Sequence, residues 1–178
     1  MEVQMFSVGD RVVHPGQGLC TVVEVREARP EGGAGTSSGM LVLEAKSGRS
    51  VTRLMCPADK AAEMLRPPVS RAQALEVIRG YAAMEPDPFT DHNSGLEERH
   101  FKALVKRGVP ESLRAVKTVR GRIAAAEAAG KKPSTYLARV LREARRRSLE
   151  ELSDALGMEP EEVAGLFGED AADFSDEA

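Results

Sequence analysis

The chain has 178 residues, of which 42% are hydrophobic, 30% charged and 4% aromatic. This composition is typical of a soluble globular protein with one or two domains. No apolar run approaches the roughly 18 residues that a membrane span needs, and the N-terminus lacks the basic region and apolar core of a secretory signal. We therefore expect a cytoplasmic protein.

The formal net charge of −3 conceals a strong asymmetry along the chain. Residues 1–69 are balanced, residues 70–147 carry 17 basic against 9 acidic residues, and residues 148–178 carry 11 acidic residues and no lysine or arginine. The basic segment favours a polyanionic partner, whereas the acidic end favours solubility or competition for the same basic surface.

The first sixty residues predict short β-strands. Two β-branched runs flank the turn "HPGQG" (14–18), and a second pair of runs flanks Ser47-Gly48. The segment between the pairs, "RPEGGAGTSSG" (29–39), predicts a flexible loop. Because four or five short strands bury little surface as a flat sheet, we expect a small closed β-barrel in which the glycines of the first turn allow a sharp bend.

The prolines at 67 and 68 interrupt this pattern, and we place a domain boundary there. From Ser70 the apolar period changes to about 3.6, and Ser70 with Gln73 predicts a capping box that begins a helix. After a loop over residues 85–95, the periodicity and the glycine stops predict four more helices. These helices cover residues 96–107, 111–129, 134–156 and 160–167.

The predicted fold class is therefore α+β, with strands followed by helices. We expect a β-barrel domain over residues 1–67 and a bundle of about five helices over residues 68–168. Residues 169–178 hold several acids and one aromatic residue, so we expect a disordered acidic tail.

No pattern of catalytic or metal-ligating residues is present. The sequence lacks a Ser/His/Asp set, a paired carboxylate motif and a P-loop, and its three histidines are scattered. Cys20 and Cys56 lack CxxC spacing, so we expect reduced and partly buried thiols. We expect neither an enzyme, nor a cofactor, nor a bound metal.

Basic residues recur on one face of each of two predicted helices. They are Arg99, Lys102 and Lys106 on the first and Arg139, Arg142 and Arg146 on the second. One interpretation is a solvated surface paired with acids such as Glu98 and Glu143. The other, favoured by the excess positive charge, is a surface that binds phosphates by counterion release without reading bases.

Two stretches resemble one family. "FSVGDRVVHPGQGLCTVVEV" (6–25) is similar to the opening of the CarD/CdnL family of bacterial RNA-polymerase-binding transcription regulators. The matching positions are Phe6, Gly9, Asp10, Val12, Val13, His14, Pro15 and Gly18. "LREARRRSLEELS" (141–153) resembles the last long helix of the family. There the aligned positions are Leu141, Ala144, Arg145, Glu151 and Leu152.

The resemblance implies a Tudor-like barrel that binds the RNA polymerase β subunit and a helical domain that contacts promoter DNA near the upstream edge of the melted bubble. Such a protein modulates open-complex formation, and we expect it to act as a monomer. The residues assigned to polymerase contact are Arg26, Arg29 and Arg53. Those assigned to DNA contact, which we expect to be non-specific, are Arg99, Lys102, Lys106, Arg139 and Arg142.

The chain departs from the family at its DNA wedge. The family places a tryptophan in the minor groove, followed by arginines, whereas here the matching residues are Ser94, Leu96 and Glu97, and the chain has no tryptophan. Serine cannot unstack a base step, so DNA contact is limited to phosphates unless Phe89 or His92 takes over as the wedge. The alternative is a protein-interaction adaptor that binds RNA polymerase or another partner without touching DNA.

Overall fold

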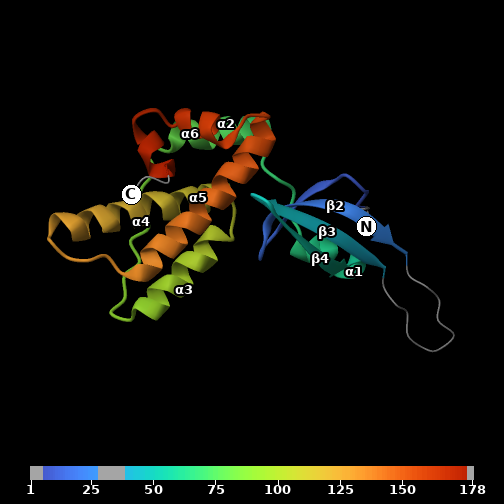
Figure 1. The fold of residues 1–178 in the computed structure, drawn as a ribbon, viewed down its shortest axis with the longest axis horizontal. Coiled ribbons are helices and arrows are strands. Elements are labelled where there is room, and N and C mark those ends of the chain that lie inside the picture. Colours follow the sequence, from blue (N-terminus) through green and yellow to red (C-terminus); the bar gives the residue numbers. More distant parts are fainter. Residues whose placement is uncertain (1–5, 28–38, 176–178) are drawn as a thin grey trace. The chain divides into compact units, whose positions relative to one another are not determined.

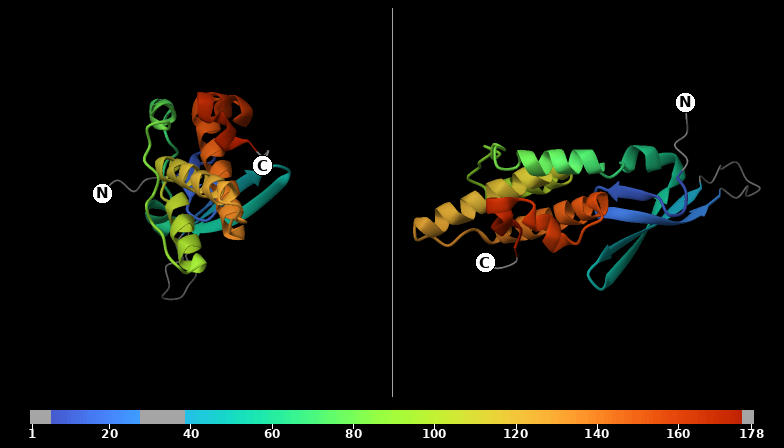
Figure 2. Two further views of the ribbon diagram at one scale, coloured as in Figure 1. Left: turned by 90° about the vertical axis from the view of Figure 1, so that its left-hand side faces the viewer. Right: turned by 90° about the horizontal axis from the view of Figure 1, so that it is seen from above.

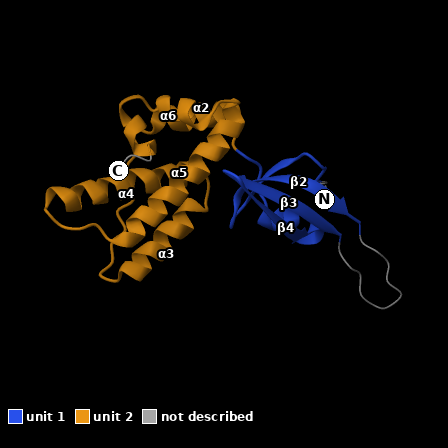
Figure 3. Ribbon diagram, viewed as in Figure 1, with its two compact units in different colours: residues 1–68 blue, residues 69–178 orange. Residues whose placement is uncertain are grey.

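The computed structural model of the chain describes residues 6–27 and 39–175 (Figure 1). The chain divides into two compact units, which we call the sheet unit (residues 1–68) and the helical unit (residues 69–178) (Figure 3). The division falls after the consecutive prolines that interrupt the strand pattern.

The sheet unit contains a four-stranded antiparallel sheet in the order β1-β2-β3-β4. Its strands are β1 (Arg11–His14), β2 (Gly18–Arg26), β3 (Met40–Ser47) and β4 (Ser50–Pro57). His14 lies opposite Gly18 in the first hairpin and Ser47 opposite Ser50 in the second. Gly48 has a φ of +57° in the tight second turn, a conformation that glycine adopts without steric cost. Both predicted strand pairs are confirmed.

The closed barrel expected from the sequence is wrong. Among the described strands, β1 and β4 are the two edges of an open sheet and do not pair with each other. A short helix that the sequence analysis missed, α1 (Ala58–Met64), covers the core instead. Ala61 and Leu65, four residues apart, pack against Val22, Leu41 and Leu43 of the sheet. Because the helix buries the apolar face, closure is not needed to remove that face from water.

The helical unit contains the five predicted helices. They are α2 (Arg71–Gly80), α3 (Ser94–Val105), α4 (Val109–Ala128), α5 (Thr135–Leu156) and α6 (Pro160–Gly165). Each of the last four begins and ends within two residues of its prediction. The capping box is confirmed, since Ser70 Oγ accepts from the Gln73 N–H while Gln73 Oε1 accepts from the Ser70 N–H.

The core of the helical unit lies where α4 and α5 pack side by side, with α3 and α2 against α5 (Figures 1 and 2). Leu113 and Val116 of α4 and Ala144 of α5 are fully buried there. Two buried hydroxyls are satisfied within this contact: Ser112 donates to the Ala144 carbonyl and Ser148 donates to Ser112. The helices are thus held in register by polar as well as apolar contacts.

The acidic C-terminal segment is ordered over most of its length, contrary to the expectation of a disordered tail. Residues Gly168–Phe174 form a 3-10 helix, η1. Phe174 is 5% exposed and stacks on Phe167 with ring centroids 4.0 Å apart, and Asp173 accepts a hydrogen bond from Tyr81 Oη at 2.8 Å. The stacking of Phe174 and the hydrogen bond to Asp173 hold in place a segment that composition alone classes as disordered. Residues 176–178 lie outside the described residues.

Candidate functional site

The sheet unit exposes apolar side chains on one face. Side chains alternate along a strand, so Val51, Arg53 and Met55 of β4 point away from the core. Val51 is 55% and Met55 56% exposed. Met55 lies directly opposite Val42 of β3, so the exposed Met55 adjoins an apolar residue that is itself buried. We call the face formed by Val42, Val51, Arg53 and Met55 the outer sheet face. Neighbouring exposed apolar groups mark an interaction surface more often than scattered ones do.

The edge of β4 next to this face is open. Within the part of the chain that the structure describes, residues 51–55 pair only with β3. An edge strand of this kind presents backbone N–H and C=O groups with which a strand of another protein can pair. The same strand thus offers backbone pairing and apolar contact.

Two of the predicted polymerase-contacting arginines lie on this sheet. Arg53 contacts Glu44, its partner across the ladder, at 3.3 Å, yet 73% of its side chain is exposed. Arg26, at the end of β2, holds Glu24 on the same strand at 2.8 Å and lowers the pKa of that carboxyl through its hydrogen bond. Both guanidinium groups remain accessible to an external acid. Arg29 lies outside the described residues.

The structure brings together the predicted DNA-contacting residues of α3 and α5. Glu98 accepts from Lys102 Nζ at 2.8 Å and from Arg139 Nη2 at 3.0 Å, so one carboxylate is shared by cations from two helices. The hydrogen bond from Lys102, with that from Arg139, lowers the pKa of Glu98. Arg99 and Lys106 are also exposed, and neither forms an ion pair with another described residue. We call these four cations the α3–α5 basic face.

Part of the basic stripe of α5 is paired internally instead. Arg146 lies 2.9 Å from Glu143 and 2.8 Å from Glu150, and Arg147 lies 2.7 Å from Glu143. Arg147 and its neighbour Arg145 are buried. The interpretation of charges paired with nearby acids therefore fits this stretch of α5, and it also fits Lys102 and Arg139 at Glu98. Arg99 and Lys106 are the cations of the α3–α5 basic face to which it does not apply.

The start of α3 holds the position at which the family places its DNA wedge. Ser94 is the first residue of the helix, and Asn93 caps it by accepting from the Gly95 N–H. Glu97 points inward and accepts from Tyr136 Oη, Arg122 and the Asp91 N–H. Sequence reasoning missed this inward acid, because its three donors come from separate segments of the chain.

Phe89 does not project as a wedge. Its ring stacks on His100 with centroids 4.1 Å apart, and its carbonyl oxygen accepts from Arg122. His92 is exposed, and Leu96, at 41% exposure, is the large apolar residue at the start of α3.

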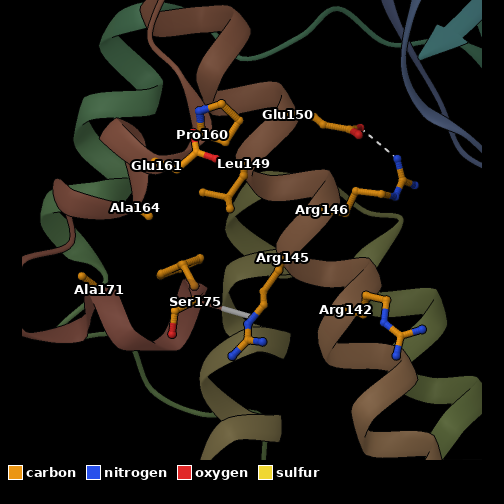
Figure 4. Close-up of a pocket in the computed structure, with 11 residues that line it drawn as sticks. Arg142, Arg145, Arg146, Leu149, Glu150, Pro160, Glu161, Ala164, Ala171 and Ser175 are labelled. Atoms are coloured by element: carbon orange, nitrogen blue, oxygen red, sulfur yellow. Dashed lines mark hydrogen bonds and ion pairs between the residues drawn. The ribbon is translucent and has the colours of Figure 1, made fainter. Parts of the chain in front are cut away.

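Arg142, the last predicted DNA-contacting residue, lines a different feature. Together with Arg145 and Arg146 it borders a groove of about 960 Å³ between α5, α6 and η1 (Figure 4). Arg142 thus borders this groove and lies three residues along α5 from Arg139 of the α3–α5 basic face.

Residues 6–69 match the family model of the CarD-like/TRCF RID domain. The N-terminal unit is a CarD-like domain. The match covers all four strands and α1, and it confirms the resemblance of residues 6–25. No curated protein matches the chain.

The CarD-like domain belongs to an RNA-polymerase-interacting family of transcription-related proteins. The outer sheet face and the β4 edge both lie within the match. The match ends at residue 69, so the helical unit, with its motif over residues 141–153, lies outside it.

Both cysteines lie in the core of the CarD-like domain. Cys20 and Cys56 are free and buried, as expected, and burial followed by the nearby Asp59 charge raises the pKa of the Cys56 thiol. Across residues 6–27 and 39–175, no three His, Cys, Asp or Glu side chains gather as a metal site would require. None of the helices described is both long and apolar enough to span a membrane.

Proposed function

We propose that the chain is a transcription regulator that binds the RNA polymerase β subunit through its CarD-like domain and contacts the promoter DNA backbone through its helical unit, modulating open-complex formation. The observation that carries the proposal is the family match over residues 6–69, on a unit whose edge strand and outer face are both exposed.

Polymerase binding is attributed to the outer sheet face and the β4 edge. A partner strand that pairs with β4 gains backbone hydrogen bonds, and Val51 and Met55 supply apolar contact beside them. Arg53 and Arg26 add charge, since both are accessible to a partner's acids. Arg29 remains a proposed contact.

DNA binding is attributed to the α3–α5 basic face. Lys102 and Arg139 share a single carboxylate, so their combined charge exceeds that of Glu98, and Arg99 and Lys106 add two further cations. No wedge is placed at Ser94, so the interaction is with phosphates and does not read base sequence. We assign Arg142 to the groove described above, which it lines, and not to this face.

The polymerase contact is tested by capture of purified RNA polymerase on the immobilised full chain. Met55→Glu should weaken capture by at least about tenfold, because it places a charge in the centre of an apolar contact. Lys60→Glu, a reversal of an exposed charge on α1, which packs on the opposite face of the sheet, is the matched control and should bind nearly as wild type. Equal capture by wild type and Met55→Glu would exclude the outer sheet face as the docking surface.

The DNA contact is tested by adding promoter DNA to the same assay. Reversal of two charges, Arg99→Glu with Arg139→Glu, should reduce DNA retention while polymerase capture stays unchanged. Loss of both DNA retention and polymerase capture, with the fold intact, would contradict the assignment of polymerase binding to the sheet unit and of DNA binding to the helical unit.

A second function, an adaptor that binds polymerase without DNA, is favoured by one observation. The position that the family uses as a wedge is Ser94, and Glu97 beside it is turned inward to Tyr136 and Arg122. If the double reversal leaves promoter DNA retention by the polymerase complex unchanged, the adaptor is the better description.

A further inference from the structure

The groove between α5, α6 and η1 is not used by either proposed contact. Arg142, Arg146 and Glu150 recur every four residues along α5 and so form one wall. The other wall contains Pro160, Glu161 and Ala164 of α6, Ala171 and Phe174 of η1, and Ser175, which follows η1. Figure 4 shows the guanidinium groups of Arg142 and Arg146 on one side and Pro160, Leu149 and Ala164 on the other.

Contacts within the chain hold the elements of the groove together without a ligand. Arg145 Nε donates to the Asp173 carbonyl and so ties η1 to α5, while Phe174, which lines the groove, stacks on Phe167. Part of the lining is apolar, because Leu149, Ala164 and Ala171 belong to it and each is only partly exposed. Its volume of 960 Å³ lies at the upper end of the roughly 300–1,000 Å³ of typical ligand pockets.

The charges of the groove are polarised. Arg142 is exposed and forms no ion pair within the described chain, whereas Arg146 is held by Glu143 and Glu150. The acids Glu150 and Glu161 mark the other end. Arg142 and Glu150 are eight residues apart on α5, which corresponds to about 12 Å along the helix. A ligand that fills the groove meets a cation at one end and carboxylates at the other.

This polarity favours a peptide over a nucleic acid. Duplex DNA carries one negative charge per about 1.7 Å, so phosphates that reach Arg142 bring others against the two glutamates. Glu150 is paired with Arg146 at 2.8 Å, whereas Glu161 forms no ion pair with another described residue, and burial raises the pKa of Glu150. A peptide can place a single acid at one end and a lysine or arginine at the other.

We propose that this groove binds a short peptide segment of a partner protein in which an acidic and a basic residue flank an apolar anchor. The acid pairs with Arg142, the anchor packs on Leu149 and Ala164, and the base approaches Glu161 and the neighbouring Glu150. This site is separate from the α3–α5 basic face and from the outer sheet face, so it stands or fails independently of the proposed function.

The test selects random peptides of about twelve residues, enough to span the groove, by display against the full chain. Enriched peptides are synthesised, and their affinities are measured by fluorescence polarisation. Arg142→Glu should weaken binding about tenfold, and Ala164→Trp, which fills the groove, should weaken it at least as much. Lys132→Glu, a reversal of an exposed charge just before α5 and outside the groove, should change affinity less than about twofold. Circular dichroism melts establish that each variant is folded.

A charge exchange sharpens the test. Replacing the acid of the selected peptide by lysine should abolish binding to wild type and restore it to Arg142→Glu. Failure of the selection to enrich any peptide overturns the proposal, as does enrichment of peptides that lack an acid or that bind Arg142→Glu as well as wild type. Displacement of the peptide by a duplex of about 20 base pairs would identify the groove as a DNA site instead.

Discussion

The outer sheet face and the α3–α5 basic face are both candidate binding surfaces, but they are built from different interactions. The first combines an open strand edge with Val51 and Met55, and charge is secondary there. The second has little apolar surface and consists of cations that outnumber the acid between them. A surface built on backbone and apolar contact resists salt and selects one partner, whereas one built on charge is salt-sensitive and tolerant of sequence.

The largest expected effect is on the stability of the helical unit, which carries the α3–α5 basic face. Phe174→Ala should lower the free energy of unfolding of the helical unit by about 3 kcal/mol, because it removes a buried ring that stacks on Phe167 and contacts Tyr81. Urea unfolding followed by circular dichroism measures the loss. Glu169→Ala, in the exposed part of η1, is the control. A loss below about 1 kcal/mol would show that η1 is not part of the core.

Salt separates the two surfaces most directly. If the four cations of the basic face each neutralise one phosphate, DNA affinity should fall roughly a hundredfold between about 50 and 200 mM salt. Polymerase capture through the outer sheet face should change far less over the same range. Parallel titrations by fluorescence anisotropy and by capture provide the comparison, and a DNA affinity indifferent to salt would contradict the phosphate-directed contact.

The inward acid Glu97 gives the helical unit an acid-sensitive stability. Burial raises its pKa, but the hydrogen bonds from Tyr136, the Asp91 N–H and Arg122 outweigh burial and lower it below 4.5. The stabilisation is therefore present above about pH 4.5 and is lost as the pH falls through the lowered value.

Glu97→Gln should accordingly cost about 1–2 kcal/mol near pH 7, and the difference from wild type should shrink in acid. Urea unfolding at several pH values measures this. Glu127→Gln, an exposed acid of α4, should show no such dependence. A difference that stays constant down to about pH 3 would mean that the charge of Glu97 is not what stabilises the fold.

The smallest effect concerns the acid shared within the basic face. Glu98→Gln should release Lys102 and Arg139 and raise DNA affinity about two- to fivefold, since exposed ion pairs are individually weak. Fluorescence anisotropy at low salt measures the change, with Glu85→Gln as an exposed control in the loop before α3. Unchanged affinity would place the DNA contact elsewhere on the helical unit.

The prediction from sequence succeeded where structure depends on neighbouring residues. The Ser70–Gln73 capping box, the hairpin turn at Gly48 and the periods of α3 to α6 are local features, and each lies close to its predicted position. The resemblance over residues 6–25 is also local, because a strand–turn–strand motif consists of consecutive residues. The family match confirms this resemblance.

The amino-acid sequence by itself thus determined the order of strands and helices, the buried free cysteines and the family of the N-terminal unit. Only the tertiary structure decided that the sheet is open beneath α1, that Glu97 faces inward and that Phe174 orders the acidic end. It also decided that Arg139 joins Lys102 while Arg142 lines a groove. These outcomes depend on contacts between residues far apart in the chain, which periodicity and composition do not encode.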